Sequence, residues 1–469
     1  MRARRRFVIS VGWLAVAIAA HLSVATAWAQ EDKKTDDDKP ADPDTGQSTI
    51  EETTLGILPN PFMDRGVKFA ATYISETLGN VSGGSRQGAV YEGRLNLAVD
   101  IDMEKLIDAR QLTFHANIFQ IHGDGLSRSY LQNFMVVSGI EALPTTRLYE
   151  AWFEQKWDSL GSLKIGQLAA DPEFFNTKYT EVFTNASLGW PAVVSIVLPS
   201  GGPSPPLAAL GARLSLNLGE DWSLQTAVFD GDAAGPGAGD AQQRNRYGLN
   251  FRINDPPLVL GQLQYAWNNK KGDEHLAGTF KIGGWHHSGA FADLRYGDDG
   301  RSMADPSSSA SPATLTGNYG FWGVFEQQLY RVAGDDDRGI GVFARAAYSP
   351  PDRSLLDIYA DCGIEWIGPT DARPNDKVGM AIAYAHVSPR AQALDADFRR
   401  IHSPTWPRRT SETMITAAYQ YEIKPGLSLQ PNLQYVVRPG GGATDPLSAD
   451  AGRRLRNAAV VGLRAVVKF

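Results

Sequence analysis

The chain has 469 residues, 45 lysines and arginines against 52 aspartates and glutamates, and a formal net charge of −7. This charge argues against a nucleic-acid-binding protein, which must neutralise phosphate groups. The single cysteine, Cys362, excludes an intramolecular disulfide, and after the N-terminal segment no apolar run reaches the roughly 18 residues that a membrane-spanning helix needs.

Residues 1–29 have the pattern of a secretory signal peptide. The basic stretch "MRARRR" precedes the apolar run "FVISVGWLAVAIAA", and Ala27-Trp28-Ala29 is a small-x-small cleavage signature. We predict cleavage after Ala29, so that the protein folds outside the cytosol. The alternative is an uncleaved N-terminal anchor, which the short apolar run and the interrupting His21 disfavour.

Residues 30–58 are polar and acidic, and they contain too few apolar side chains to offset the entropy cost of ordering the chain. We therefore predict a disordered leader at 30–58. The composition changes once, and no further boundary divides the remainder. Residues 59–469 are predicted to form one domain.

From about Val67 the chain alternates apolar and polar residues, as β-strands do when their successive side chains point to opposite faces. In "YEGRLNLAVDI", for example, Leu95 and Leu97 lie on the face opposite Arg94. The stretches "LYEAWFEQKW", "ALGARLSLNL" and "YGLNFRIND" alternate in the same way and are predicted to be strands. The charged residues predicted on the polar faces of the strands are Glu92, Arg94, Glu150, Glu154, Arg213, Arg252 and Arg345.

Two architectures fit strands with one apolar and one charged face. A soluble sandwich buries the apolar face in a core, whereas a transmembrane barrel turns that face to lipid and its charges to a wet lumen. Aromatic residues near the strand ends suit the interfacial girdles of a barrel. These residues are Tyr149, Trp157, Trp222, Tyr247 and Trp267.

The lengths of the connections favour the barrel. Long polar or Gly/Pro-rich stretches at 122–146, 170–207, 297–317, 388–410 and 439–455 alternate with the short stretches "DSLGS", "GED", "NDPP" and "KPG". Long extracellular loops and short periplasmic turns are typical of outer-membrane barrels. We predict an all-β protein, a transmembrane antiparallel β-barrel of the bacterial outer membrane with about 16 strands, or about 18 as the alternative.

The chain ends in "NAAVVGLRAVVKF", and the alternation continues to the terminal Phe469. Val467 and Leu463 share one face, while Lys468 and Arg464 share the other. A last strand that ends on an aromatic residue resembles the signal by which outer-membrane barrels reach their assembly machinery. We therefore expect Phe469 to be the barrel assembly signal.

Several stretches carry a resemblance to a known family. They are "RGVKFAATYISETLGNVSGG", "LYEAWFEQKW", "GSLKIGQLAADPEFFNTKY", "LPSGGPSPPLAALGARL" and "LSLQPNLQYVVRPGGG", and the block from Gly166 to Arg213 is the most specific. From about residue 60 to residue 469 the chain resembles the carbohydrate-selective porins of the OprB type.

The resemblance implies a barrel with the lower of the two strand counts, monomeric or homotrimeric, in the outer membrane of a Gram-negative bacterium. Its inward-folded loops would narrow a water-filled channel for the passive diffusion of monosaccharides and other small sugars. Lipopolysaccharide, other outer-membrane lipid and the barrel assembly machinery are the expected partners. The leader at 30–58 would then lie in the periplasm.

Sugar recognition requires particular side chains. A sugar presents hydroxyl groups around a ring with apolar C–H faces, so a selective constriction combines planar polar groups with aromatic surfaces. The candidates for sugar contact in the connection after residue 170 are Asp171, Glu173, Phe174, Phe175 and Trp190. The alternative is structural: Glu150 and Arg94 only solvate the water-filled lumen and pair with one another, and Trp190 pins a loop to the wall.

Two other function classes stay open. A porin of this fold could be general or could select inorganic ions, although the mixture of Glu with Arg favours a neutral solute. A barrel enzyme would need Ser, His and a third polar partner together, and no motif organises His115 and Ser127. We expect no enzyme activity and no cofactor. We also expect no metal site, because His286 and His287 would point to opposite sides of a strand.

Overall fold

The computed structural model describes residues 53–270, 272–450 and 452–469. The predicted signal peptide at 1–29 and most of the predicted leader, 30–52, lie outside the described residues. Residues 53–58 form no helix or strand, and the Leu55 backbone N–H donates to the carbonyl oxygen of Lys468 at 2.8 Å. This contact joins the segment before the first strand to the end of the last strand.

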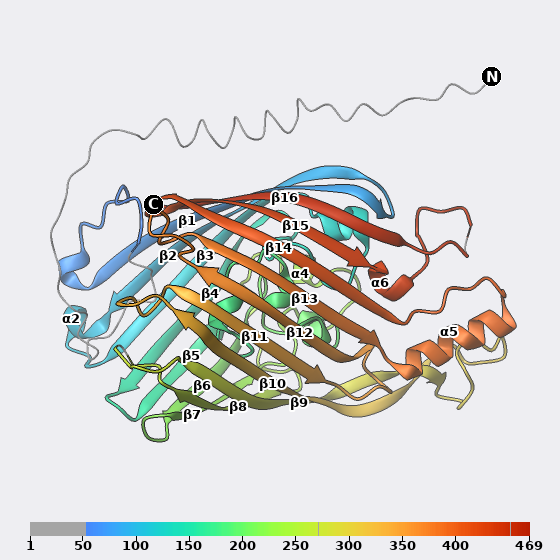
Figure 1. Ribbon diagram of the computed structural model, residues 1–469. Coiled ribbons are helices and arrows are strands. Elements are labelled where there is room, and N and C mark those ends of the chain that lie inside the picture. Colours follow the sequence, from blue (N-terminus) through green and yellow to red (C-terminus); the bar gives the residue numbers. More distant parts are fainter. Residues whose placement is uncertain (1–52, 271, 451) are drawn as a thin grey trace. The chain divides into compact units, whose positions relative to one another are not determined.

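Sixteen antiparallel strands form one closed barrel, in which each strand pairs with its neighbours in sequence and β1 also pairs with β16. Figure 1 shows the tilted strands as a ring with further segments inside it. The predicted all-β barrel with 16 strands is confirmed, and the alternative of 18 strands is not.

The strands are β1 Val67–Gly84, β2 Gly88–Asp102, β3 Leu112–Gly123, β4 Thr145–Trp157, β5 Gly161–Leu168, β6 Ala209–Asn217, β7 Trp222–Phe229, β8 Leu258–Trp267, β9 Gly278–Gly297, β10 Pro312–Arg331, β11 Gly339–Tyr348, β12 Leu356–Ile367, β13 Lys377–Val387, β14 Ser411–Lys424, β15 Leu427–Val437 and β16 Arg456–Lys468. The short helical segments are η1 Met63–Arg65, α2 Met103–Ile107, η2 Ser127–Leu131, η3 Lys178–Thr180, η4 Ala186–Leu188, α3 Ala192–Ser195, η5 Pro199–Gly201, α4 Ala241–Arg244, α5 Pro389–Ile401 and α6 Pro439–Gly442. Within the described ranges, none of the helices has the length and the apolar character needed to cross a bilayer.

Alternation along the strands separates an outward face from a lumen face. On β13 the outward side chains of Val378, Met380 and Ile382 are exposed, whereas the intervening Ala381 and Ala383 are buried. Large apolar groups outside suit contact with lipid. Small groups inside leave room for the loops that enter the lumen.

The longest connections of the barrel lie at one end, although β1 and β2 are joined there by 85–87 alone. The long end carries 124–144, 169–208, 230–257, 388–410 and 438–455, and the short end carries 158–160, 218–221 and 425–426. In Figure 1, α5 and α6 lie at the long end, whereas α2 and the C-terminus lie at the short end. The predicted alternation of long loops with short turns is confirmed for the short stretches "DSLGS", "GED" and "KPG", but not for "NDPP".

The strand predicted around Arg252 is wrong. Residues 247–253 belong to the connection 230–257, and "NDPP" is the end of this long loop rather than a tight turn. Pro256 and Pro257 stand directly before β8 and lack the N–H groups that a strand ladder needs. Tyr247, expected in an aromatic girdle, lies in the same loop.

The predicted position of Tyr149 is wrong as well. The pairing of β3 with β4 shifts register between Ala116 and Ile118, so a bulge interrupts the alternation of β4. A bulge changes the face on which the following residues lie, and Tyr149 is buried with 5% of its surface exposed. Trp157 and Trp222 are exposed near strand ends, as a girdle requires.

The connections 124–144 and 169–208 fold into the lumen and bond to each other. The Gly139 N–H donates to the Thr184 carbonyl oxygen at 2.8 Å, and the Ala186 N–H donates to the Val136 carbonyl oxygen at 2.9 Å. The two loops therefore form one connected layer across the barrel.

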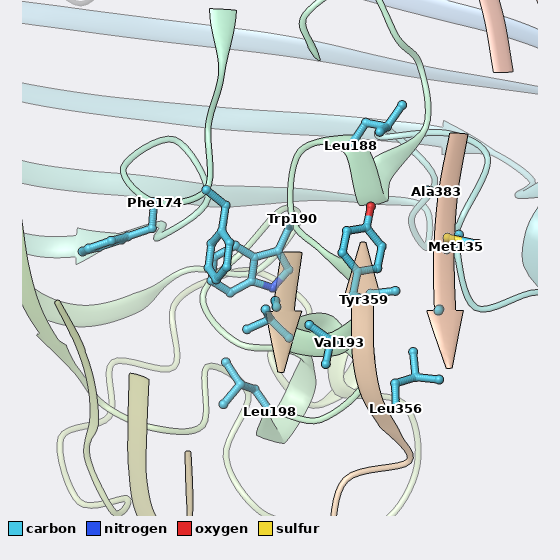
Figure 2. Packing of buried hydrophobic residues seen from close by; sticks show 14 of the residues in the cluster. Met135, Phe174, Leu188, Trp190, Val193, Leu198, Leu356, Tyr359 and Ala383 are labelled. Atoms are coloured by element: carbon cyan, nitrogen blue, oxygen red, sulfur yellow. The ribbon is translucent and has the colours of Figure 1, made fainter. Parts of the chain in front are cut away.

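The apolar core of the protein lies where this layer meets the inner wall. Figure 2 shows Trp190 in the middle of the cluster, with Phe174 and Leu198 around it. Tyr359 of β12 reaches in from the wall, and its hydroxyl group points toward the turn that carries Leu188.

Phe469 follows β16 at the seam where the barrel closes. Its backbone N–H donates to the carbonyl oxygen of Ala71 on β1 at 2.9 Å. The ladder between β1 and β16 runs from Thr72 paired with Lys468 to Gly84 paired with Arg456. The last residue therefore extends the closed seam.

Candidate channel constriction

A cavity of about 650 Å³ lies inside the barrel, between its wall and the inward loops. The wall contributes Ile74 of β1, Arg94 of β2 and Arg464 of β16. Parts of the loops 124–144, 169–208 and 230–257 form the other sides.

Two arginines face this cavity from the wall. The guanidinium group of Arg94 lies over the ring of Phe119, 4.5 Å from the ring centre. Arg464 forms an ion pair with Glu76 at 2.6 Å. Arg94 was predicted from the sequence and Arg464 was missed, although the alternation of the last strand already put Arg464 on the polar face.

Asp171 faces the cavity from the start of the loop 169–208. The hydroxyl group of Tyr149 lies 3.5 Å from its carboxylate. Burial, together with the nearby Glu150 carboxylate, raises the pKa of Asp171 to about 7. Burial also raises the pKa of Glu141, which lines the cavity from the loop 124–144.

Trp190 also lines the cavity, but only a small part of its ring is accessible, with 5% of the residue exposed. Its indole N–H donates to the carbonyl oxygen of Gly201 at 3.1 Å. The ring of Phe175 meets it edge-on, with the ring centres 5.3 Å apart. Trp190 therefore holds the loop together and presents a limited apolar face to the cavity.

Arg345 does not reach the cavity. Its guanidinium group is an ion-pair partner of Asp361 at 2.6 Å, and it donates to the carbonyl oxygens of Phe175, Ser187 and Gly189 at 2.9–3.0 Å. Each of those carbonyl groups belongs to the loop 169–208. Arg345 is thus an anchor that ties this loop to β11.

A second set of contacts near the start of the loop 169–208 involves four of the predicted charges. Glu173 of the loop forms ion pairs with Lys164 at 2.6 Å and with Arg213 at 3.1 Å, and Arg213 also pairs with Glu154 at 2.8 Å. Glu150 accepts the backbone N–H of Ala169 at 2.9 Å. These side chains lie on the lumen side, but their charged groups already bind partners in the loop 169–208 or in the wall.

The remaining candidates lie away from the cavity. Phe174 and Phe175 are almost fully buried, and both rings contact Trp322 of β10. Glu92 is buried on β2 and pairs in register with Glu76. Arg252 forms an ion pair with Asp255 at 2.6 Å within the loop 230–257.

The residues considered for other chemistry do not converge. His115 pairs with Asp100 at 2.5 Å, whereas the Ser127 hydroxyl accepts the N–H of Val137 at 3.0 Å. In the part of the chain that the structure describes, no three His, Cys, Asp or Glu side chains are arranged to hold a metal ion.

Comparison with known proteins agrees with this architecture. The family described as carbohydrate-selective porin, OprB family, matches residues 86–469. Porin B of Pseudomonas aeruginosa is 24% identical over 408 residues, which cover 81% of this chain and 84% of that protein. A putative porin of Acinetobacter baylyi, QuiX, is 22% identical over 399 residues, or 80% of this chain and 85% of that protein.

The fold is also that of a solved structure. The high-pH structure of Pseudomonas putida OprB matches with a TM-score of 0.75 and 22% sequence identity, covering 87% of this chain and 95% of that chain. Because the family match extends over residues 86–469, the chain belongs to the carbohydrate-selective porins of the OprB family, which are channels of the Gram-negative outer membrane.

Proposed function

We propose that the cavity beside Arg94 and Arg464 is the sugar-selective constriction of this porin, through which monosaccharides and other small sugars diffuse passively. The observation that carries the proposal is the lining of one cavity by two guanidinium groups, the Asp171 carboxylate and the Trp190 ring. The predicted residues at the anchors would act indirectly, by holding the loop 169–208 in place.

The lining suits a neutral polyhydroxylated solute. A guanidinium group presents N–H donors in a planar fork, which matches neighbouring hydroxyl groups on a ring. The carboxylate of Asp171 accepts hydroxyl donors, and the Trp190 ring offers an apolar surface to C–H groups. Positive and negative groups together leave a weak net field, so the cavity does not require a charged solute.

The test is single-channel conductance in planar bilayers with graded sugars added as blockers. We expect Arg94→Ala to weaken sugar block by about tenfold, the effect of losing one hydrogen bond to a charged group, and to shift ion preference toward cations. Trp190→Ala should weaken the block without this shift, because it removes no charge. Leu95→Ile, on the outward face of the same strand, is the control. If neither Arg94→Ala nor Trp190→Ala altered sugar block, the constriction would lie elsewhere.

The second candidate is a porin with general or inorganic-ion selectivity. Arg94 and Arg464 favour ion selectivity if their positive charge exceeds the negative charge of the acidic groups in the cavity at the pH of the measurement. Conductance that no sugar reduces, together with a strong reversal potential in a salt gradient, would select this candidate. A barrel enzyme remains a remote alternative, and we propose that the chain has no catalytic activity.

The assembly of the protein is part of the same proposal. We propose that the barrel assembly machinery reads Phe469, that lipopolysaccharide surrounds the barrel, and that the protein functions as a monomer or homotrimer. Chemical cross-linking in outer membranes distinguishes the two oligomeric states. Heat-modifiable migration on gels reports the assembled barrel.

A further inference from the structure

Glu412 lies on the lumen side of β14 and is fully buried. Its carboxylate accepts three backbone N–H groups, from Phe134 at 2.8 Å, Met135 at 2.7 Å and Gly440 at 2.7 Å. The first two donors belong to the loop 124–144, which connects β3 to β4, and neither of those strands is a neighbour of β14 in the barrel. One side chain of β14 therefore joins the connection after the neighbouring β15 to the loop 124–144, which starts from a distant part of the wall.

The same loop supplies one side of the cavity. Phe134 and Val136 line it, and the carbonyl oxygen of Val136 accepts the N–H of Ala186 in the loop 169–208 at 2.9 Å. A displacement of Phe134 from Glu412 would therefore move lining residues directly. It would also move the second loop through the backbone bonds between the two loops.

A carboxylate is well matched to this position. An ionised carboxylate has only acceptors, and three N–H donors offset much of the cost of burying its charge. A glutamine side chain at 412 would turn its NH₂ group toward at least one of these donors and leave a buried N–H unpaired.

We propose that Glu412 is a positioning residue of the channel. It holds the loop 124–144 across the lumen and thereby sets the shape of the cavity without touching the solute. Neighbouring contacts to the same loop are neutral and therefore weaker: Asn185 donates to the Met135 carbonyl oxygen at 3.2 Å, and Gln434 of β15 donates to the Val137 carbonyl oxygen at 2.8 Å. The part of the proposal that concerns sugar block rests on the proposed constriction.

The test compares Glu412→Gln with Glu422→Gln, the same substitution near the short-turn end of the same strand. Glu422 accepts a hydrogen bond from the side chain of Asn375 at 2.7 Å, in the connection before β13. Both variants carry Met135→Cys, because Met135 is fully buried, and Cys362→Ala, because Cys362 is exposed and would itself react. The measurements are the rate at which a charged methanethiosulfonate labels the introduced thiol and the sugar block of single channels.

We expect Glu412→Gln to raise the labelling rate by about tenfold or more, since it loses a buried hydrogen bond to a charged group, while the barrel remains heat-modifiable. Sugar block should weaken. Glu422→Gln should match the protein that carries only Met135→Cys and Cys362→Ala in both measurements. An unchanged labelling rate in a folded Glu412→Gln barrel overturns the proposal.

Two further outcomes are informative. Faster labelling with unchanged sugar block supports the positioning of the loop by Glu412 and contradicts the proposed constriction instead. If Glu412→Gln does not assemble, Glu412→Asp takes its place with the same expectations, because it keeps the charge but withdraws the oxygens from the loop. Failure of both variants to assemble overturns the positioning role, because Glu412 would then be required to build the barrel.

Discussion

Several of the lumen charges that the sequence offered as channel-lining groups, namely Glu150, Arg213 and Arg345, hold loops against the wall. Arg345 donates to carbonyl groups of the loop 169–208, and Arg213 pairs with Glu173 of the same loop. A loop that enters a lumen brings backbone N–H and C=O groups that must be paired once they leave water. Long charged side chains on the wall can reach these backbone groups, as Arg345 and Glu150 do.

Arg345 is expected to stabilise the assembled barrel. Replacing it by Met removes the bonds to the loop and leaves the buried Asp361 carboxylate without its ion-pair partner, which costs about 3–5 kcal/mol. We expect Arg345→Met to lower the temperature at which the barrel loses its heat-modifiable form. The unfolding temperature of Arg345→Lys should lie between those of wild type and Arg345→Met, because lysine keeps the positive charge but loses the planar fork of N–H donors. Equal unfolding temperatures for Arg345→Met and for the exposed-site control Arg456→Met would contradict the anchor.

The ion preference of the channel is expected to depend on pH through Asp171. The pKa of Asp171 is about 7 in the folded protein, above its usual 3.8, so the folded protein binds this proton more tightly than the unfolded chain. The contribution of Asp171 to stability therefore falls as pH rises from about 4 to about 7. Over the upper part of this range the cavity gains a negative charge, and its preference for cations should increase.

Reversal potentials of wild type and Asp171→Asn, measured in a salt gradient at acidic and alkaline pH, check this expectation. Asp171→Asn should lose most of the pH dependence, with Glu141 supplying the remainder. Asp371→Asn, at an exposed position in the connection before β13, should behave as wild type. If the reversal potential of Asp171→Asn changed with pH as much as that of wild type, Asp171 would not be the source of the pH dependence.

At the scale of elements, the strands are shaped to receive the loops. Gly341 of β11 faces the ring of Tyr179, and a Cβ atom at Gly341 would lie 2.0 Å from the ring carbon Cζ. On β13 a Cβ atom at Gly379 would lie 2.5 Å from Val182. Both contacts involve residues 179–183 of the loop 169–208, so these glycines provide the space in which that part of the loop sits.

The element-scale prediction is that Gly341→Val displaces Tyr179 from the wall toward the channel axis. We expect a lower single-channel conductance and a loss of about 1–3 kcal/mol of stability from overpacking. Gly261→Val on β8 is the matched control, because no atom lies within 4 Å of its added Cβ. Wild-type conductance in Gly341→Val would show that the loop can absorb the added methyl groups.

At the scale of the whole molecule, closure of the barrel depends on the pairing of β1 with β16. The Phe469 N–H extends this seam by its bond to Ala71. Phe469→Ser keeps the backbone bond and removes only the aromatic side chain. If that side chain is the assembly signal, the variant should be exported normally but show less heat-modifiable barrel in outer membranes, whereas Phe469→Tyr should assemble well. If Phe469→Ser assembled normally, the aromatic side chain would not be the assembly signal.

The barrel class and most of its strands could be predicted from the sequence, because alternation and connection length are local properties of the chain. The exceptions have local causes that alternation cannot express. The alternation around Arg252 was real, but two prolines and an Asp255 partner keep this segment in a loop. The inward position of Tyr149 depends on a bulge, which only the pairing with β3 defines.

Alternation and connection length along the chain predicted a barrel with charged groups on the lumen face, and the family resemblance predicted a sugar porin. Neither pattern specifies which charged groups meet the cavity, because this depends on how the loops fold back into the lumen. Arg94 and Arg345 have the same alternating surroundings, yet Arg94 lines the cavity and Arg345 binds the loop 169–208. The physical reason is that a strand pattern specifies the face on which a side chain lies, whereas its partners depend on where distant loops return to the wall.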